Sequence, residues 1–218
     1  VAKRIQLLRE LMKKHRVDAY YVPSADPHQS EYVADCWQRR AYISGFSGSA
    51  GTVVVTANQA GLWTDSRYFL QAKEELEGSG ITLFKMGEPG ETGIEQWLVE
   101  ELGRGKNVGF DPWVMSIGQH RSMKDRLAQG KISLVPVRED LVERVWGDQK
   151  PPIPTRPVVE HSIQYAGQTT ADKVSMIREE MAQRGTQAMV VSALDEVAWL
   201  LNLRGSDVDF NPVSIAYV

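Results

Sequence analysis

Apolar residues near the start of the chain recur at helical spacing. They are Ile5, Leu7, Leu8, Leu11 and Met12, and most of the positions between them hold Lys, Arg or Glu. This pattern predicts an amphipathic helix over residues 3–14 whose apolar side lies on a sheet.

Six short apolar runs predict the strands of that sheet. They lie at residues 19–22, 51–56, 60–63, 81–84, 106–110 and 132–137. Helical patterns lie between several of these runs, at residues 68–77, 94–102 and 117–128. The alternation of strands and helices predicts an α/β layer fold.

Prolines cluster after this alternating region, with four of them among residues 150–157. Because proline has no amide donor and a fixed φ, neither a helix nor a central strand is expected there. We therefore predict a first domain over residues 1–150, a proline-rich linker over 151–157 and the start of a second domain over 158–218.

The second domain repeats the opening order of helix and then strand. Thr170 or Asp172 is expected to cap a helix that runs to about Arg184. A strand at residues 188–192 and a helical turn at 196–201 follow. With so few strands to cover its apolar faces, this domain is expected to be marginally stable alone.

The composition is that of a soluble globular protein, with 42% hydrophobic and 24% charged residues among 218. The 25 Lys and Arg are scattered among 28 acidic residues, so no basic stripe indicates nucleic-acid binding. No apolar run reaches the roughly 18 residues of a membrane span, and no membrane partner is expected. The basic run at residues 13–16 is expected to close the first helix, where cations face the negative end of its dipole.

Cys36 is the only cysteine, which excludes an intrachain disulfide and makes a reducing, cytoplasmic compartment the simplest inference. No feature of the sequence places a histidine against this thiol. We therefore expect a small buried hydrophobic side chain and not a catalytic nucleophile.

Glycine and serine are concentrated at residues 44–51, where backbone amides could bind an anion. A phosphate-binding loop requires a following helix with Lys-Ser or Lys-Thr after the last glycine. Here Gly51 leads into a β-branched run, so a tight turn that feeds a strand is favoured over a nucleotide site.

The segment 23–32 follows a predicted strand and contains Asp26, His28 and Glu31. Their spacing fits no metal-ligand pair on a helix, so a structural role for this loop is favoured. The other histidines, His15, His120 and His161, stand apart in polar surroundings and are expected at the surface.

The sequence Trp63-Thr-Asp-Ser-Arg-Tyr68 ends one predicted strand and opens a helix. Arg67 falls in the first turn, where the positive end of the helix dipole disfavours a cation unless an acid or an anionic ligand accompanies it. A salt bridge to Asp65 and a guanidinium that binds a peptide carbonyl or carboxylate are both open interpretations.

The last motif surrounds an apolar core, Val197 to Leu201, with charged residues. These are Asp195, Glu196, Arg204, Asp207 and Asp209. Adjacent Asp195 and Glu196 point about 100° apart on a helix and no histidine is near, so an ion-paired helix cap is favoured over a metal site.

Five stretches in the same order closely resemble the large, three-domain type of Xaa-Pro aminopeptidase (aminopeptidase P) in the creatinase/prolidase superfamily. They are residues 23–32, 39–52, 62–72, 109–112 and 192–213. The most specific are Trp-Thr-Asp-x-Arg-Tyr-Phe and Ala-Leu-Asp-Glu-x-Ala-Trp-Leu-x-Asn-Leu-Arg-Gly-Ser-Asp-Val.

The resemblance implies a creatinase-like N-terminal domain with a mixed sheet flanked by helices, then a truncated second domain of the same kind. The catalytic "pita-bread" domain of the family, with two divalent metal ions that are usually manganese, is expected to be missing. No catalytic or metal-binding residue is therefore assigned here. The family arginine implicated in substrate binding corresponds to Arg67.

In this family the parent enzyme is a cytoplasmic hydrolase that removes the N-terminal residue before a penultimate proline, and it is commonly a homodimer. The resemblance thus implies a fragment that is inactive alone but contributes to dimer assembly and to substrate access for such peptides. The alternative is a free-standing, non-enzymatic protein-interaction module of creatinase-like fold.

Overall fold

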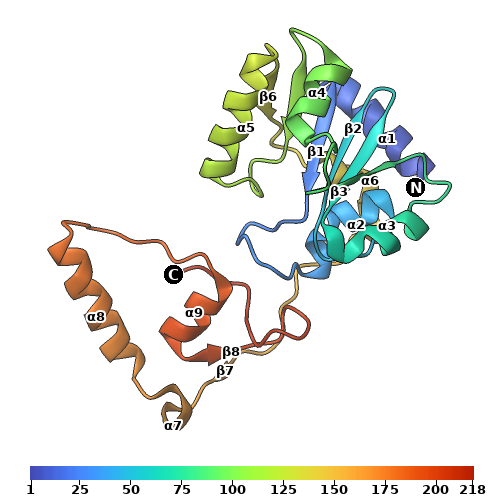
Figure 1. Ribbon diagram of the computed structural model, residues 1–218. Helices are drawn as coiled ribbons and strands as arrows, with labels where there is room; N and C mark the ends of the chain where they lie inside the picture. The colour runs from blue at the N-terminus through green and yellow to red at the C-terminus, as the bar shows by residue number, and fades with distance from the viewer. The chain divides into compact units, whose positions relative to one another are not determined.

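The computed structural model describes all residues from Val1 to Val218 (Figure 1). The chain forms two compact units. The first unit comprises Val1–Pro27 and Trp37–Lys150, and the second comprises His28–Cys36 and Pro151–Val218. The short segment His28–Cys36 thus belongs to the second unit although both of its flanks belong to the first.

The first unit is built on a six-stranded mixed sheet in the order β4-β3-β2-β1-β5-β6. The strands are β1 Ala19–Pro23, β2 Thr52–Thr56, β3 Ala60–Thr64, β4 Thr82–Lys85, β5 Asn107–Phe110 and β6 Ser133–Pro136. Strand β2 is antiparallel to β1 and β3, and the remaining neighbours are parallel. All six predicted strands are confirmed.

Six helices flank this sheet (Figure 1). They are α1 Ala2–Lys14, α2 Arg39–Ser44, α3 Phe69–Glu75, α4 Ile94–Leu102, α5 Ile117–Gln129 and α6 Leu141–Trp146. The four predicted helices are present, and the third begins with a 3-10 turn, η2 Ser66–Tyr68. Two further 3-10 turns are η1 Asp35–Trp37 and η3 Gly147–Gln149. Helices α2 and α6 were not predicted, because six residues are too few to show helical periodicity.

Alternating side chains of the strands build two cores, one on each face of the sheet. In β2, Val53 and Val55 pack with apolar residues of α1, α2, α3 and α6, whereas Val54 packs with those of α4 and α5. The expected fold, a mixed sheet flanked by helices, is therefore confirmed. Lys13 and Lys14 lie in the last turn of α1, as expected.

The second unit contains little regular structure. Its elements are β7 Val159–Glu160, α7 Ile163–Ala166, α8 Thr170–Gln183, α9 Leu194–Leu201 and β8 Leu203–Arg204, and β7 and β8 form a two-stranded antiparallel sheet. Its apolar cluster has three buried residues, Val191, Val197 and Leu200. Lys173 is buried as well, and its ammonium donates to the Trp199 carbonyl and to Asn202 Oδ1 at 2.8 and 2.6 Å.

Two predictions for the second unit are wrong. The cap of α8 is Thr169, which forms a capping box with Asp172, because Thr170 is already helical and its predecessor has extended backbone. Residues 188–192 form no strand. Val191 alone makes a reciprocal backbone pair, with Val218, and a single pair does not build a ladder.

The buried Cys36 is confirmed as a small hydrophobic side chain. None of the helices is both long enough and apolar enough to cross a bilayer.

Gly61 in β3 tests the packing of the sheet. A methyl group there would lie 2.6 Å from the Trp63 ring and 2.8 Å from the Phe84 ring, and these two rings stack at 4.3 Å. Gly61→Ala is therefore expected to lower the free energy of unfolding by about 1–3 kcal/mol, measured by urea denaturation. Gly118→Ala in α5, where the nearest atom is 4.0 Å away, is the control and should not destabilise. Equal stability of the two variants would contradict this account.

Candidate functional site

Two segments meet at one edge of the sheet because β2 and β3 are antiparallel. Thr52, at the start of β2, pairs with Trp63, near the end of β3. The residues before β2, which we call the rim loop (45–51), therefore lie beside those after β3, which we call the rim turn (65–68). Thr64 Oγ1 donates to the Ala50 carbonyl at 2.7 Å and joins the two segments.

Arg67 is exposed in the rim turn and is bound by Asp65 in a bidentate pair. Its Nε lies 2.9 Å from Asp65 Oδ1 and its Nη2 lies 2.8 Å from Oδ2. Asp65 Oδ1 also accepts from the Arg67 amide and so caps the 3-10 turn. Hydrogen bonding from Arg67 holds the pKa of Asp65 below its usual range. The expected salt bridge is confirmed, and the binding role of Arg67 stays a prediction.

Tyr68 places its ring beside this guanidinium and its hydroxyl group against the rim loop. Its oxygen lies 2.7 Å from Ser49 Oγ of the rim loop. Arg67 Cζ lies 5.2 Å from the centroid of the Tyr68 ring, which is within the range of a cation–π contact. The rim thus presents a planar cation and two hydroxyl groups together, a set that can bind a carbonyl or carboxylate oxygen.

The rim loop is a turn that leads into β2 and not a phosphate-binding loop. Gly45 ends α2 in the left-handed conformation at φ 79°, and Gly51 leads into β2, as predicted. The carbonyl oxygens of Phe46 and Gly48 accept from the guanidinium of Arg40. A loop that directs carbonyls towards a cation does not form a cradle for phosphate.

The segment with Asp26, His28 and Glu31 provides structural contacts. Asp26 and His28 are buried, and Glu31 is exposed. The His28 ring stacks on Tyr217 at 4.3 Å, and its Nδ1 lies 2.9 Å from the Ser192 carbonyl. Nowhere in the chain do three or more His, Cys, Asp or Glu side chains come together in a group that could hold a metal ion.

The other three histidines are only partly exposed, and none is isolated. His15 pairs with Glu139 at 3.2 Å. The rings of His120 and His161 lie 5.5 and 6.0 Å from those of Phe110 and Tyr165. The three histidines thus lie partly at the surface, but each ring has a neighbour and is not isolated as predicted.

The charged set around α9 does not form the predicted ion-paired cap. Ala193 occupies the cap position, and Asp195 and Glu196 lie exposed in the first turn, where the helix dipole favours negative charge. Buried Asp207 accepts from the amides of Arg156 and Ile215, each at 3.0 Å. Asp209 pairs with the Arg156 side chain and Arg204 with carbonyls of Ala198 and Leu203, so these residues brace the chain locally.

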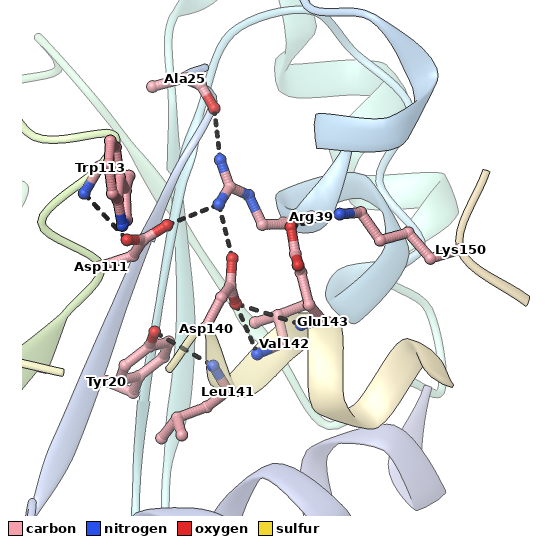
Figure 2. Close-up of polar contacts among 10 residues, drawn as sticks. All are labelled: Tyr20, Ala25, Arg39, Asp111, Trp113, Asp140, Leu141, Val142, Glu143 and Lys150. Atoms are coloured by element: carbon pink, nitrogen blue, oxygen red, sulfur yellow. Dashed lines mark hydrogen bonds and ion pairs between the residues drawn. The ribbon is translucent and has the colours of Figure 1, made fainter. Parts of the chain in front are cut away.

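A buried ionic centre around Arg39 was not found from the sequence (Figure 2). Arg39 Nη1 donates to Asp111 at 2.6 Å and to Asp140 at 2.5 Å, and Nη2 donates to the Ala25 carbonyl at 3.1 Å. Asp140 also caps α6 through the amides of Val142 and Glu143. One guanidinium thus joins the loops after β1 and β5 to the start of α6.

Two carboxylates share this single buried guanidinium, so negative charges outnumber positive ones, and the pKa values of Asp111 and Arg39 are both shifted. Burial, together with the charge of Asp140, raises the pKa of Asp111. For Arg39, burial alone would lower the pKa, but the nearby carboxylates raise it above its usual value. Asp111 follows a strand and Asp140 precedes a helix, which is the positional signal that could have indicated this centre.

Two family models described as the creatinase/prolidase N-terminal domain match the chain, at residues 4–145 and 149–218. The chain is 45% identical over 216 residues to a probable Xaa-Pro aminopeptidase P of Penicillium rubens, covering 99% of this chain and 35% of that protein. It is 44% identical over 221 residues to aminopeptidase P2 of Arabidopsis thaliana, covering 100% of this chain and 31% of that protein.

Among solved structures, the chain is similar to X-prolyl aminopeptidase from Caenorhabditis elegans, described as a cytosolic enzyme with a di-nuclear active site. The TM-score is 0.93 at 39% identity, and the match covers 99% of this chain and 36% of that one. The mixed sheet with helices on both faces thus has the fold of a peptidase N-terminal region.

The chain belongs to the creatinase/prolidase N-terminal domain family. The resemblance to aminopeptidase P noted in the sequence is confirmed, and it concerns the N-terminal part of those enzymes. The chain spans about a third of the length of the curated relatives that it matches.

Arg39→Met tests the ionic centre, because it leaves the carboxylates of Asp111 and Asp140, whose side chains are 7% and 10% exposed, without their cation. We expect the free energy of unfolding at pH 7 to fall by about 3–5 kcal/mol. Burial already raises the pKa of Asp111, and without the cation this pKa should rise further, so the loss should shrink as the pH falls and Asp111 becomes protonated.

Arg9→Met is the matched control, since Arg9 binds only the neutral carbonyls of Thr56 and Gln59. Its smaller loss should not change between pH 4 and pH 7. Chemical denaturation at both pH values distinguishes the two variants, and equal, pH-independent losses would rule out a charge-balancing role for Arg39.

Proposed function

We propose that the chain supplies a non-catalytic N-terminal region of an Xaa-Pro aminopeptidase, which removes the N-terminal residue before a penultimate proline. The proposal rests on the similarity to aminopeptidases P over 99% of the chain, with a TM-score of 0.93 to the C. elegans enzyme. That similarity is the observation that carries the proposal, and the rim motif, in which Asp65 holds an exposed Arg67 next to Tyr68, supports its substrate-binding part.

Residues 1–218 do not contain the ligands for the metal centre of the proposed enzyme. No group of three metal-ligating side chains exists in the chain, so no step of the reaction is assigned to these residues. In this proposal, the ligands of two divalent ions, with manganese as the expected metal, lie in the part of the relatives that this chain does not cover. The C. elegans relative is described as having a di-nuclear active site, which agrees with two metal ions.

Within such an enzyme, we assign this region to homodimer assembly and to controlling the access of peptides with a penultimate proline. Arg67 has the role of orienting the peptide, because its planar donors suit a carbonyl or carboxylate oxygen. The proposed location is the cytoplasm. We also propose the division into domains 1–150 and 158–218 with the linker 151–157, the second domain being incomplete here.

The alternative is a free-standing interaction module. The geometry of the rim alone does not distinguish the two, because exposed pairs of arginine and carboxylate are common on protein surfaces. The similarity to aminopeptidases P over 99% of the chain favours the peptidase assignment.

Arg67→Ala in the full-length native gene product tests the proposal. We expect kcat/KM for a peptide with a penultimate proline to fall at least about tenfold, mainly through KM, because a charge-assisted contact is worth about 1.5–3 kcal/mol. Metal content should be unchanged.

Arg126→Ala is the matched control. The Arg126 side chain is 63% exposed, like that of Arg67, and it also pairs with a carboxylate, Glu95, at 3.5 Å. Its removal should leave both kinetic constants within about twofold of wild type. Unchanged kinetics for Arg67→Ala would refute the role of Arg67 in substrate binding.

A further inference from the structure

Arg40 is a buried cation whose hydrogen-bond acceptors are all uncharged. It is 2% exposed. Nε donates to Ser24 Oγ at 2.9 Å, Nη1 to the Phe46 carbonyl at 2.5 Å and Nη2 to the Gly48 carbonyl. Burial lowers the pKa of Arg40 to about 10, so the group remains charged at neutral pH. The charge of Glu75 acts on Arg40 as well, but no carboxylate is among its hydrogen-bond acceptors. Because a buried charge needs its hydrogen-bond partners, these contacts hold the rim loop in one conformation.

The rim loop, in turn, fixes the position of Tyr68. A methyl group on Gly48 would lie 2.7 Å from Cδ1 of the Tyr68 ring, so ring and loop backbone are in close contact. The Phe46 ring meets the Tyr68 ring edge-on at 5.9 Å, and Ser49 shares a hydrogen bond with the Tyr68 hydroxyl. Both residues that bind Arg40 through their carbonyls thus also contact Tyr68.

Tyr68 and Asp65 then set the orientation of Arg67. Asp65 binds the Nε and Nη2 edge of the guanidinium, and the Tyr68 ring lies 5.2 Å from Cζ. If the Tyr68 ring shifted, Arg67 would lose this ring contact and keep only its pair with Asp65 of the two. The contacts therefore run in sequence from Arg40 through the rim loop and Tyr68 to Arg67.

Glu75 of α3 holds the outer side of the same loop. Its carboxylate accepts from the amide and the hydroxyl of Ser47 at 2.8 and 2.6 Å. Burial alone would raise the pKa of Glu75, but hydrogen bonds from Ser47 and Gln71 and the charge of Arg40 bring it below its usual value. The loop is held from both sides, and Arg40 alone binds the two carbonyls next to Tyr68.

We propose that Arg40 is a positioning residue for Arg67, acting through the rim loop and Tyr68. The inference rests on the proposed role of Arg67 in binding the peptide, and it adds a residue that itself touches no substrate. Losing the planar fork of Arg40 should release the loop, misplace Tyr68 and weaken substrate binding at Arg67.

Arg40→Lys in the full-length native gene product is the first test, since a single ammonium cannot reach three oxygens arranged around a planar fork. We expect KM to rise about threefold or more, with kcat nearly unchanged. Arg9→Lys is the matched control, because Arg9 also binds two carbonyls, those of Thr56 and Gln59, at the opposite end of β2. KM of this control should stay at the wild-type value.

A double-mutant cycle separates positioning from a general loss of folded protein. When Arg67 is already Ala, Arg40→Lys should not raise KM any further. If it raises KM by the same factor with and without Arg67, Arg40 does not act through Arg67 and the inference fails, although the proposed function stands. If Arg67→Ala alone has no effect on KM, the proposed role of Arg67 in binding the peptide fails and the inference fails with it.

Gly48→Ala keeps the inference testable if Arg40→Lys does not fold. Its methyl group would lie 2.3 Å from the Phe46 ring and 2.7 Å from the Tyr68 ring, so it would displace both rings while the Arg40 side chain is unchanged. The backbone of Gly48 needs no left-handed conformation. The same rise in KM, abolished when Arg67 is Ala, is expected. In both variants amide hydrogen exchange of residues 46–49 should be faster than in wild type, and unchanged exchange together with unchanged KM would overturn the inference.

Discussion

Two adjacent buried guanidinium groups at the start of α2 fix the loops on which the candidate site depends. Consecutive residues on a helix point about 100° apart, so Arg39 and Arg40 serve two different sets of loops. Arg39 binds Asp111, which follows β5, and Asp140, which precedes α6. Arg40 binds the rim loop. They also share one segment, since Arg39 binds the Ala25 carbonyl and Arg40 binds the Ser24 hydroxyl. Without the contacts of Arg40, the rim loop would keep Glu75 on its outer side but would lose the hydrogen bonds to its Phe46 and Gly48 carbonyls.

The topology of the sheet decides where these loops lie. Because β2 is antiparallel to β3, the rim loop before β2 meets the rim turn after β3, and Arg67 stands next to Tyr68 and Ser49. Because β1 and β5 are parallel, their following loops meet at one edge, where Arg39 joins them. The proposed binding role of Arg67 depends on family membership as well as on geometry, since an arginine in an exposed bidentate pair is common on protein surfaces.

The sequence predicted the elements that are long or strongly periodic, and missed those that depend on distant contacts. All six strands of the first unit and its four longer helices follow from hydrophobic pattern, while α2 and α6 are too short to show one. The Asp65–Arg67 pair was foreseeable because it is local. Arg39 pairs with Asp111 and Asp140, which lie 72 and 101 positions further along the chain. Arg40 binds backbone carbonyls, and because every residue has one, the sequence does not indicate which of them it binds. The predicted strand at 188–192 failed because only Val191 finds a backbone partner.

The central claim is that these 218 residues are a non-catalytic part of a larger metallopeptidase. The intact mass of the native gene product, measured by mass spectrometry, tests it most directly. Because the chain covers 35% of the P. rubens relative, the claim predicts a product of roughly three times the 24.4 kDa of this chain. A native product of about 24.4 kDa would contradict it and would favour a free-standing interaction module.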